Sequence, residues 1–295
     1  VLCPVARENL HTFMMEKAFK GINVTIPYKK DVLPYLNELT DDAKEIQCVN
    51  TIIKRPDGTL LGHNTDISGF MTMVKNAQMD VQGKKAVVLG SGGTSLTATV
   101  SLRKMGAKEI VIISRTGEND YQSLYEKHKD AQVLVNTTPV GMYPNNGQSP
   151  ADLSRLPKLE CVIDVIYNPE KTALILQAES LHIPCVSGLP MLVAQARKAA
   201  EMFSGKAIPE SEDSRIIKEI KSQTLNLILI GMPGCGKSNI GRRLAERMNR
   251  PLIDTDAEIE KLAGKSIPEI FAHDGETQFR NLETEVLSAF CKGHG

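Results

Sequence analysis

Two glycine-rich turns, each directly after a short apolar run, constrain the fold of this chain more than any other feature. The first is "VVLGSGG" (87–93) and the second is "LILIGMPGCGKS" (227–238). Glycines leave backbone N–H groups accessible, and the N-terminus of a helix that follows a strand attracts phosphate. The sequence therefore predicts two phosphate-binding α/β units in one chain.

Composition limits the partners that such a chain can have. With 295 residues and 41% hydrophobic content, roughly two globular domains are expected. The formal net charge of zero gives no reason to expect nucleic acid or an anionic membrane, so small molecules are the expected partners. No apolar run reaches the roughly 20 residues of a membrane span, and no signal-peptide pattern is found. Six scattered cysteines without a CxxC pair indicate a reduced, cytoplasmic protein, whose oligomeric state stays open.

Apolar runs bounded by polar residues or glycine predict buried parallel strands at 85–90, 109–114, 131–136, 161–166 and 227–231. Helical patterns at 97–106 and 191–203 fall among them. Alternation of strand and helix predicts a doubly wound parallel sheet of the Rossmann type.

The chain divides into four predicted segments. Residues 1–75 form a separate substrate-binding lobe, with a charged helix near 30–46 and a hairpin turn at "RPDGTL" (55–60). Residues 76–205 form the dinucleotide-binding domain, whose last helix returns to the first lobe. Polar residues 206–224 are a linker, and 225–295 form an incomplete P-loop α/β domain.

The first glycine turn places Gly90, Gly92 and Gly93 between a strand and a helix, which favours dinucleotide binding over a simple tight turn. Arg115 follows the next strand, where an NAD enzyme carries an acidic residue for the ribose hydroxyls. An arginine there suits a 2′-phosphate and predicts NADP, although a solvated surface arginine is the alternative.

Several polar motifs together resemble the shikimate dehydrogenase family over about 1–205. They are "NVTIPYK" (23–29), "VNT" (49–51), "GHNTD" (62–66), "GSGG" (90–93), "NTTPVGM" (136–142), "DVIYNP" (164–169) and "GLPMLVAQA" (188–196). The resemblance implies NADP-dependent interconversion of 3-dehydroshikimate and shikimate, with Lys29 and Asp66 as the catalytic pair. Interconverting an alcohol and a ketone requires a group that moves the hydroxyl proton, which a lysine of tuned pKa can do.

The same resemblance implies further site residues. The substrate ligands are Thr25, Asn50, Tyr167 and Gln195, with a core tyrosine as the alternative for Tyr167. The cofactor ligands are the three glycines, Arg115, Thr116, Asn136, Thr137, Thr138, Gly188 and Met191. The early Ser-x-Ser pair of the family has no counterpart in 1–22, and the chain begins with Val, so we expect an N-terminal truncation.

The second glycine turn satisfies the pattern GxxxxGK[ST] with Gly231, Gly236, Lys237 and Ser238, and Gly234 lies within the loop. Backbone amides of such a loop surround ATP phosphates, the lysine reaches the outer phosphates and the serine ligates Mg²⁺. The alternative is a glycine-rich entry into a helix.

Residues 225–295 resemble shikimate kinase in this loop, in "PLIDTDAEIE" and in "GETQFRNLE". The resemblance implies that Asp256 and Arg280 bind shikimate, that Asp254, after a short strand near 251–253, lies at the Mg²⁺ and that ATP phosphorylates the 3-hydroxyl. The chain thus resembles a fusion of two consecutive enzymes of aromatic amino-acid biosynthesis. Because the arginines of the kinase lid have no counterpart, we expect a C-terminal truncation and an inactive kinase half.

Two alternatives stay open at this point. The chain could be a nucleotide-binding fragment without turnover, or its first half could act on quinate as well as shikimate. Assays of turnover and of both acids distinguish them.

Overall fold

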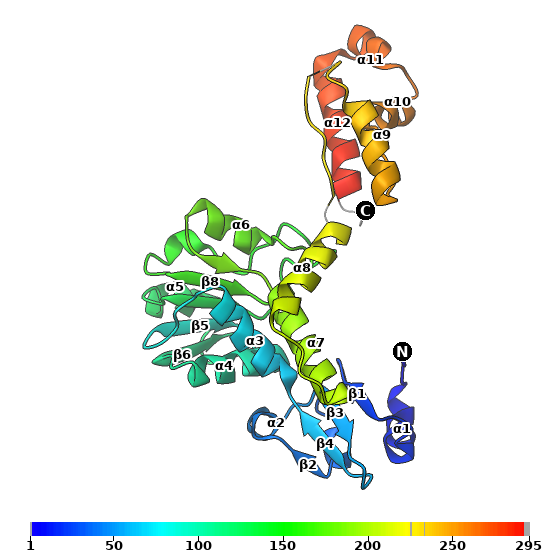
Figure 1. Cartoon of the computed structure of the whole chain (residues 1–295). Helices are drawn as coiled ribbons and strands as arrows, with labels where there is room; N and C mark the ends of the chain where they lie inside the picture. The colour runs from blue at the N-terminus through cyan, green and yellow to red at the C-terminus, as the bar shows by residue number, and fades with distance from the viewer. Residues whose placement is uncertain (1, 225, 233, 292–295) are drawn as a thin grey trace. The chain divides into compact units, whose positions relative to one another are not determined.

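The computed structural model describes residues 2–224, 226–232 and 234–291. The chain divides into two compact units, which we call unit 1 (Val1–Ile217) and unit 2 (Lys218–Gly295). Figure 1 shows the helices and strands of both. Each unit is described by itself.

The first lobe of unit 1 is built on a four-stranded sheet of order β1-β3-β4-β2. Its elements are α1 (Leu10–Glu16), β1 (Gly21–Asn23), β2 (Glu38–Leu39), α2 (Asp41–Ile46), β3 (Thr51–Lys54) and β4 (Leu60–His63). Strands β3 and β4 pair antiparallel, which confirms the hairpin predicted at 55–60. The helix predicted near 30–46 is wrong for most of its length. Residues 33–35 form a single 3-10 turn and residues 38–39 pair with β4, so only 41–46 are α-helical.

The second sheet of unit 1 is parallel, with order β6-β5-β7-β8-β9. Its strands are β5 (Lys85–Leu89), β6 (Glu109–Ile113), β7 (Val133–Asn136), β8 (Cys161–Asp164) and β9 (Cys185–Val186). The helices around it are α3 (Thr65–Asn76), α4 (Gly93–Lys104), α5 (Tyr121–Lys127), α6 (Ala173–Ser180) and α7 (Leu189–Ser204). One face of the sheet packs on α3, α4 and α7 and the other on α5 and α6, which confirms the doubly wound prediction.

Helix α7 joins the two sheets of unit 1. It packs lengthwise on α3 and also contacts β3 of the first lobe (Figure 1). Near its end, the Phe203 ring lies so close to Gly21 that a Cβ built there would be 2.5 Å from it. Residues of α7 are therefore placed between the lobe and the dinucleotide-binding sheet.

The segment predicted as a linker contains helix α8 (Ser211–Thr224). Its residue Asp213 is buried and accepts a hydrogen bond of 2.8 Å from Nε of Arg197 on α7. The start of α8 is thus packed on unit 1 rather than extended in solvent.

Unit 2 contains, in its described residues, positions 218–224 of α8 and the helices α9 (Lys237–Met248), α10 (Thr255–Ala263), α11 (Ile267–His273) and α12 (Gly275–Cys291). The strands predicted at 227–231 and 251–253 are wrong, because these residues form no strand and belong to neither sheet. Ile228 and Ile230 are 68% and 89% exposed. A strand is stable only when another strand takes up its backbone groups. Throughout the described part of the chain, no helix is long and apolar enough to cross a membrane.

Candidate functional site

Lys29 and Asp66, which are 37 positions apart, meet in the first lobe of unit 1. Lys29 lies in the turn after β1, where its carbonyl accepts from the Val49 amide at 2.9 Å. Asp66 lies in the first turn of α3. The Lys29 Nζ donates to Asp66 Oδ2 at 2.6 Å, and the two side chains are 28% and 16% exposed. The predicted pair is thus a charge-assisted hydrogen bond that is still accessible to a ligand.

Asn50 fixes the carboxylate from the other side. Its Nδ2 donates to Asp66 Oδ1 at 2.9 Å, and its Oδ1 accepts from the Thr65 amide at 2.8 Å. Asn50 is 4% exposed. Because the amide is buried and satisfied, it holds both Asp66 and the start of α3 in one position.

Helix α3 begins with an N-cap that was not predicted as a site residue. Asn64 accepts from the Ile67 amide at 3.2 Å and donates to the Cys48 carbonyl at 3.0 Å. An Asn before a helical run, as in "GHNTD", is the sequence signal that could have identified it. Burial raises the pKa of the Cys48 thiol, which lies near both Lys29 and Asp66.

Gln195 reaches the same cluster from α7. Its Oε1 lies 3.4 Å from Thr65 Oγ1, and its Nε2 donates to the Leu192 carbonyl at 3.0 Å. Thr65 is a further residue that the sequence did not single out, although it adjoins Asp66. The structure therefore gathers Lys29, Asn50, Asp66 and Gln195 through Thr65.

Two other predicted substrate ligands lie more openly. Thr25 is exposed in the segment before Lys29, and its carbonyl accepts from the Tyr28 amide at 3.0 Å. Tyr167 follows β8 and is 50% exposed, so the alternative of a core tyrosine is wrong.

The first glycine turn is shaped to admit a phosphate. Gly90 has φ +106°, and a Cβ there would lie 2.9 Å from Thr137 Oγ1. Gly92 caps α4, and Cβ atoms built on Gly92 and Gly93 would meet nothing within 4 Å. Open space at the N-terminus of a helix fits the diphosphate of a dinucleotide.

The loop after β7 is held by buried polar contacts. Asn136 donates to Asp164 at 3.0 Å, and its Oδ1 accepts from the amide and the hydroxyl of Thr138 at 3.0 and 2.7 Å. Burial raises the pKa of Asp164, although three hydrogen bonds oppose the shift. At Gly188, a Cβ would lie 2.0 Å from the Val165 carbonyl oxygen, so only glycine fits there.

Arg115 and Thr116 are exposed directly after β6, the strand beside β5. The turn is tied by the Ser114 amide, which donates to the Asn119 carbonyl at 3.0 Å. Because carboxyl ends of neighbouring parallel strands share one edge, Arg115 lies on the same edge of the sheet as the glycine turn.

The second glycine turn is closed on itself. The Lys237 Nζ donates to the carbonyls of Gly231 and Met232 at 2.6 and 2.9 Å. Gly234 and Gly236 have φ of +76° and +88°, and Ser238 is exposed in the first turn of α9. The loop thus leads into a helix as predicted, but the described residues before it form no strand, and its lysine is bound to backbone oxygens.

Among the described residues, no hydrogen bond or ion pair joins Asp256 and Arg280, the predicted shikimate ligands of unit 2. Asp254 caps α10 by accepting from the Asp256 amide at 3.2 Å, and so does not end a strand as predicted. Arg280 instead pairs with Glu283 and Glu276 of its own helix at 3.0 and 3.3 Å. The described residues hold no preformed cluster of metal-binding side chains.

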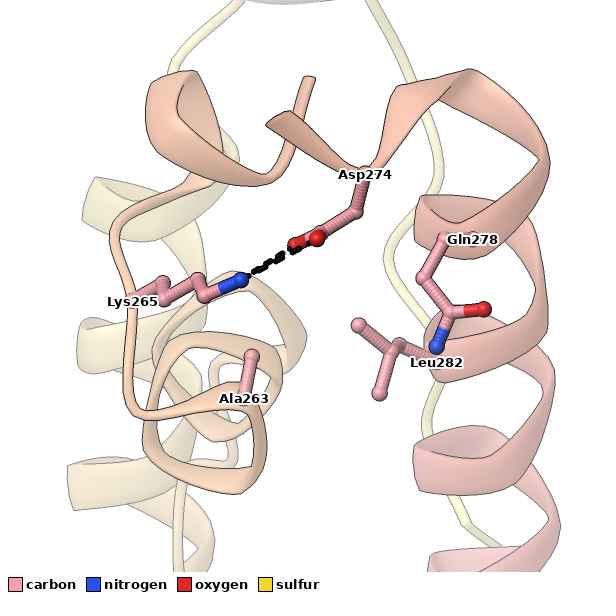
Figure 2. Close-up of a pocket in the computed structure, with 5 residues that line it drawn as sticks. All are labelled: Ala263, Lys265, Asp274, Gln278 and Leu282. Carbon is pink, nitrogen blue, oxygen red and sulfur yellow. Dashed lines mark hydrogen bonds and ion pairs between the residues drawn. The ribbon is translucent and has the colours of Figure 1, made fainter. Parts of the chain in front are cut away.

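A cavity of about 440 Å³ in unit 2 lies outside both predicted sites. Figure 2 shows Lys265 and Asp274 directed toward each other at one end, with Nζ 2.8 Å from the nearer carboxylate oxygen. Gln278 and Leu282 of α12 line the opposite side. The charges of Lys265 and Asp274 thus neutralise each other at this end of the cavity.

The structure combines a parallel sheet with a glycine turn for a dinucleotide and a Lys–Asp pair that can move a hydroxyl proton. This combination defines a nicotinamide-dependent dehydrogenase of secondary alcohols. Comparisons with known proteins agree. Residues 3–52 match the family model described as shikimate dehydrogenase substrate binding domain, and residues 233–295 match that of shikimate kinase. The shikimate dehydrogenase (NADP(+)) of Caldanaerobacter subterraneus subsp. tengcongensis is 36% identical over 223 residues, covering 70% of this chain and 79% of the relative.

Solved structures give the same result. Shikimate dehydrogenase 1 from Peptoclostridium difficile has a TM-score of 0.67 and 35% identity, covering 74% of this chain and 85% of that one. Quinate dehydrogenase from Corynebacterium glutamicum in complex with NAD has a TM-score of 0.66 and 27% identity, covering 71% and 82%. The chain belongs to the shikimate dehydrogenase family. Its C-terminal residues 233–295 are a shikimate kinase segment fused to the dehydrogenase part.

Proposed function

We propose that unit 1 catalyses the NADP-dependent interconversion of 3-dehydroshikimate and shikimate. The observation that carries the proposal is the 2.6 Å contact between Lys29 and Asp66. Gln195 places beside this pair an amide that can bind a further hydroxyl of a polyol acid, and Asn50 would do so by exchanging one of its present partners. The relative from Caldanaerobacter, named for NADP(+), supports both substrate and cofactor.

Lys29 transfers the proton of the reacting hydroxyl. In the direction of reduction its Nζ donates a proton to the substrate oxygen that becomes the hydroxyl, and in oxidation it takes that proton back. Asp66 holds the ammonium in place and stabilises its charge. NADP(H), when bound, supplies or accepts the hydride.

The cofactor would be held along the carboxyl edge of the parallel sheet. Gly90, Gly92 and Gly93 would receive the diphosphate, and Arg115 with Thr116 would bind the 2′-phosphate. The nicotinamide end would lie among the remaining proposed ligands, which are Asn136, Thr137, Thr138, Gly188 and Met191.

For unit 2 we propose binding of ATP with Mg²⁺ at a site for phosphorylation of the shikimate 3-hydroxyl, with no turnover by residues 225–295 alone, as the sequence predicts. The family match of 233–295 supports this assignment. Lys237 would exchange its two loop carbonyls for phosphate oxygens, and Ser238 and Asp254 would lie at the metal. Asp256 and Arg280 would bind shikimate.

The proposal for unit 1 is tested by measuring the reduced cofactor that forms from shikimate or from quinate. Each acid is assayed once with NADP and once with NAD. Quinate is included because the quinate dehydrogenase from Corynebacterium shares the fold at 27% identity. Higher kcat/KM for quinate than for shikimate would reverse the substrate assignment. Nucleotide binding without turnover of either acid would instead favour the binding-fragment alternative.

The variant Lys29→Ala tests the mechanism. Loss of a general acid–base group is expected to lower kcat by about 10²- to 10⁴-fold, with a smaller change in KM. Lys30→Ala is the matched control, because Lys30 is the exposed neighbour in the same turn. Equal kcat for Lys29→Ala and Lys30→Ala would disprove the proposed role of Lys29.

A further inference from the structure

Helices α3 and α7 approach each other closely at Gly69, in the interior of α3. A Cβ built on Gly69 would lie 2.8 Å from the Met191 carbonyl oxygen, 2.9 Å from the Gln195 Cβ and 3.2 Å from the backbone nitrogen of Gln195. Real Cβ atoms essentially never come within 3.0 Å of such neighbours. Two of the three atoms belong to the backbone of α7, so a side chain at Gly69 could fit only if α7 moved.

Gly69 shares one face of α3 with the catalytic cluster. Residues three and four positions apart lie next to each other on a helix, so Gly69 follows Asp66 and Thr65 by one turn. Across the contact, Gln195 is both the residue that Gly69 touches and the residue whose Oε1 reaches Thr65 at 3.4 Å. The distance between α3 and α7 therefore sets where the Gln195 amide stands relative to Asp66.

The sequence gives glycine at this position no other purpose. Gly69 is buried in a regular helix of ordinary φ, where alanine is the more favourable residue for the helix itself. The neighbouring contacts are fixed as well, because the Gln195 Nε2 is bonded to Leu192 in the preceding turn of α7. Close packing of α7 is thus the property that glycine supplies.

We infer that Gly69 is a positioning residue for the dehydrogenase reaction, which sets the place of the Gln195 amide in the substrate site through the α3–α7 contact. The inference rests on the proposed function of unit 1. It adds a determinant of shikimate recognition that touches no substrate atom.

The test is a kinetic comparison of wild type with Gly69→Ala. Displacement of a substrate-binding group by about 1 Å can cost about 10²-fold, and a loss of this order in kcat/KM for shikimate is expected. The dissociation constant of NADP should change less than kcat/KM, because the phosphate turn belongs to α4 and, of the proposed cofactor ligands, Met191 is the one that lies at the α3–α7 contact. Gly241→Ala is the matched control, since Gly241 is a helical glycine of unit 2 whose nearest neighbours are the tips of Leu252 and Leu229.

A double-mutant cycle shows whether Gly69 acts through Gln195. If it does, Gly69→Ala/Gln195→Ala should be about as active as Gln195→Ala alone. Full additivity of the two effects, or wild-type kcat/KM in Gly69→Ala, would overturn the inference while leaving the proposed function intact. A wild-type chain that does not oxidise shikimate would reject the proposed function and this role together.

A second variant covers the case in which Gly69→Ala does not fold. Gln195→Asn withdraws the same amide by one methylene, about 1.5 Å, without any change at the helix contact. It is expected to lower kcat/KM for shikimate by a similar factor. Wild-type kinetics in Gln195→Asn would show that the position of the amide is unimportant and would equally refute the inference.

Discussion

The buried pair of Arg197 and Asp213 should decide the stability of unit 1, although Asp213 belongs to the segment predicted as a linker. The two side chains are only 2% and 6% exposed, and Nε and Oδ1 are 2.8 Å apart. Glu201 and the Ile208 carbonyl accept from Arg197 at 3.3 and 3.5 Å. Burial opposes the charge of Arg197, but its pKa is raised because these carboxylates outweigh burial.

Asp213→Ala would leave this guanidinium buried without its nearest carboxylate. Breaking one half of a buried pair costs about 3–5 kcal/mol in the free energy of unfolding. For a unit of about this size each kcal/mol shifts the thermal midpoint by about 2–4 °C, so a decrease of about 6–20 °C is expected. Scanning calorimetry of the whole chain measures it.

Glu212→Ala is the matched control for this experiment. Its carboxylate is 39% exposed and pairs with Arg215 at 2.7 Å on the surface of α8. Surface pairs contribute about 0–1 kcal/mol, so the midpoint should hardly change. A double replacement of the pair, Arg197→Met with Asp213→Leu, should recover part of the loss, because it leaves no unpaired charge. Equal midpoints for Asp213→Ala and Glu212→Ala would refute the claim that the buried pair of Arg197 and Asp213 stabilises unit 1.

Three further predictions follow from single groups. Arg115→Ala should weaken NADP and hardly affect NAD, and an unchanged ratio of the two kcat/KM values would remove Arg115 from the 2′-phosphate site. Burial raises the pKa of Cys161 to about 11, so iodoacetamide at pH 8 should label the exposed Cys3 and spare Cys161, as peptide mass spectrometry would report. Burial, and then Arg55, lower the pKa of His63, so the folded state favours the neutral ring. Its contribution is therefore present above about pH 6.5 and lost as the pH falls through the lowered pKa, and His63→Gln should flatten the decline of the thermal midpoint from about pH 7 to 5.

The parallel sheet of unit 1 could be predicted from the sequence because its strands are buried on both faces. Val87, Val88 and Leu89 are all fully buried although they point alternately to opposite sides of β5. Such strands appear as continuous apolar runs, which need no knowledge of their neighbours. The short strands of the first lobe lack this signal, and the helix predicted near 30–46 was wrong for that reason.

The candidate site was only partly predictable. Lys29, Asn50, Asp66 and Gln195 were assigned through family motifs, whereas their meeting through Thr65 depends on two helices and a strand end. Asp164 was missed as a residue, because a carboxylate in an apolar run does not reveal its buried partners Asn136 and Thr172. Burial of a polar side chain is a property of the fold, and the local pattern does not contain it.

The boundary between the two units lies within the predicted linker, between 217 and 218. Two segments around it nevertheless differ from what their composition indicates, for opposite reasons. The run 227–231 is apolar enough for a buried strand, but apolar composition does not supply the neighbouring strand that takes up backbone hydrogen bonds. Residues 211–217 are polar enough for a linker, yet they pack, because one carboxylate meets one buried guanidinium. An apolar pattern thus indicates which side chains gain free energy from burial. A polar pattern indicates which side chains are costly to bury. In both segments the outcome depends on whether another part of the chain offers a partner. Arg197 is the partner of Asp213, whereas no described strand pairs with the backbone of Ile228 and Ile230.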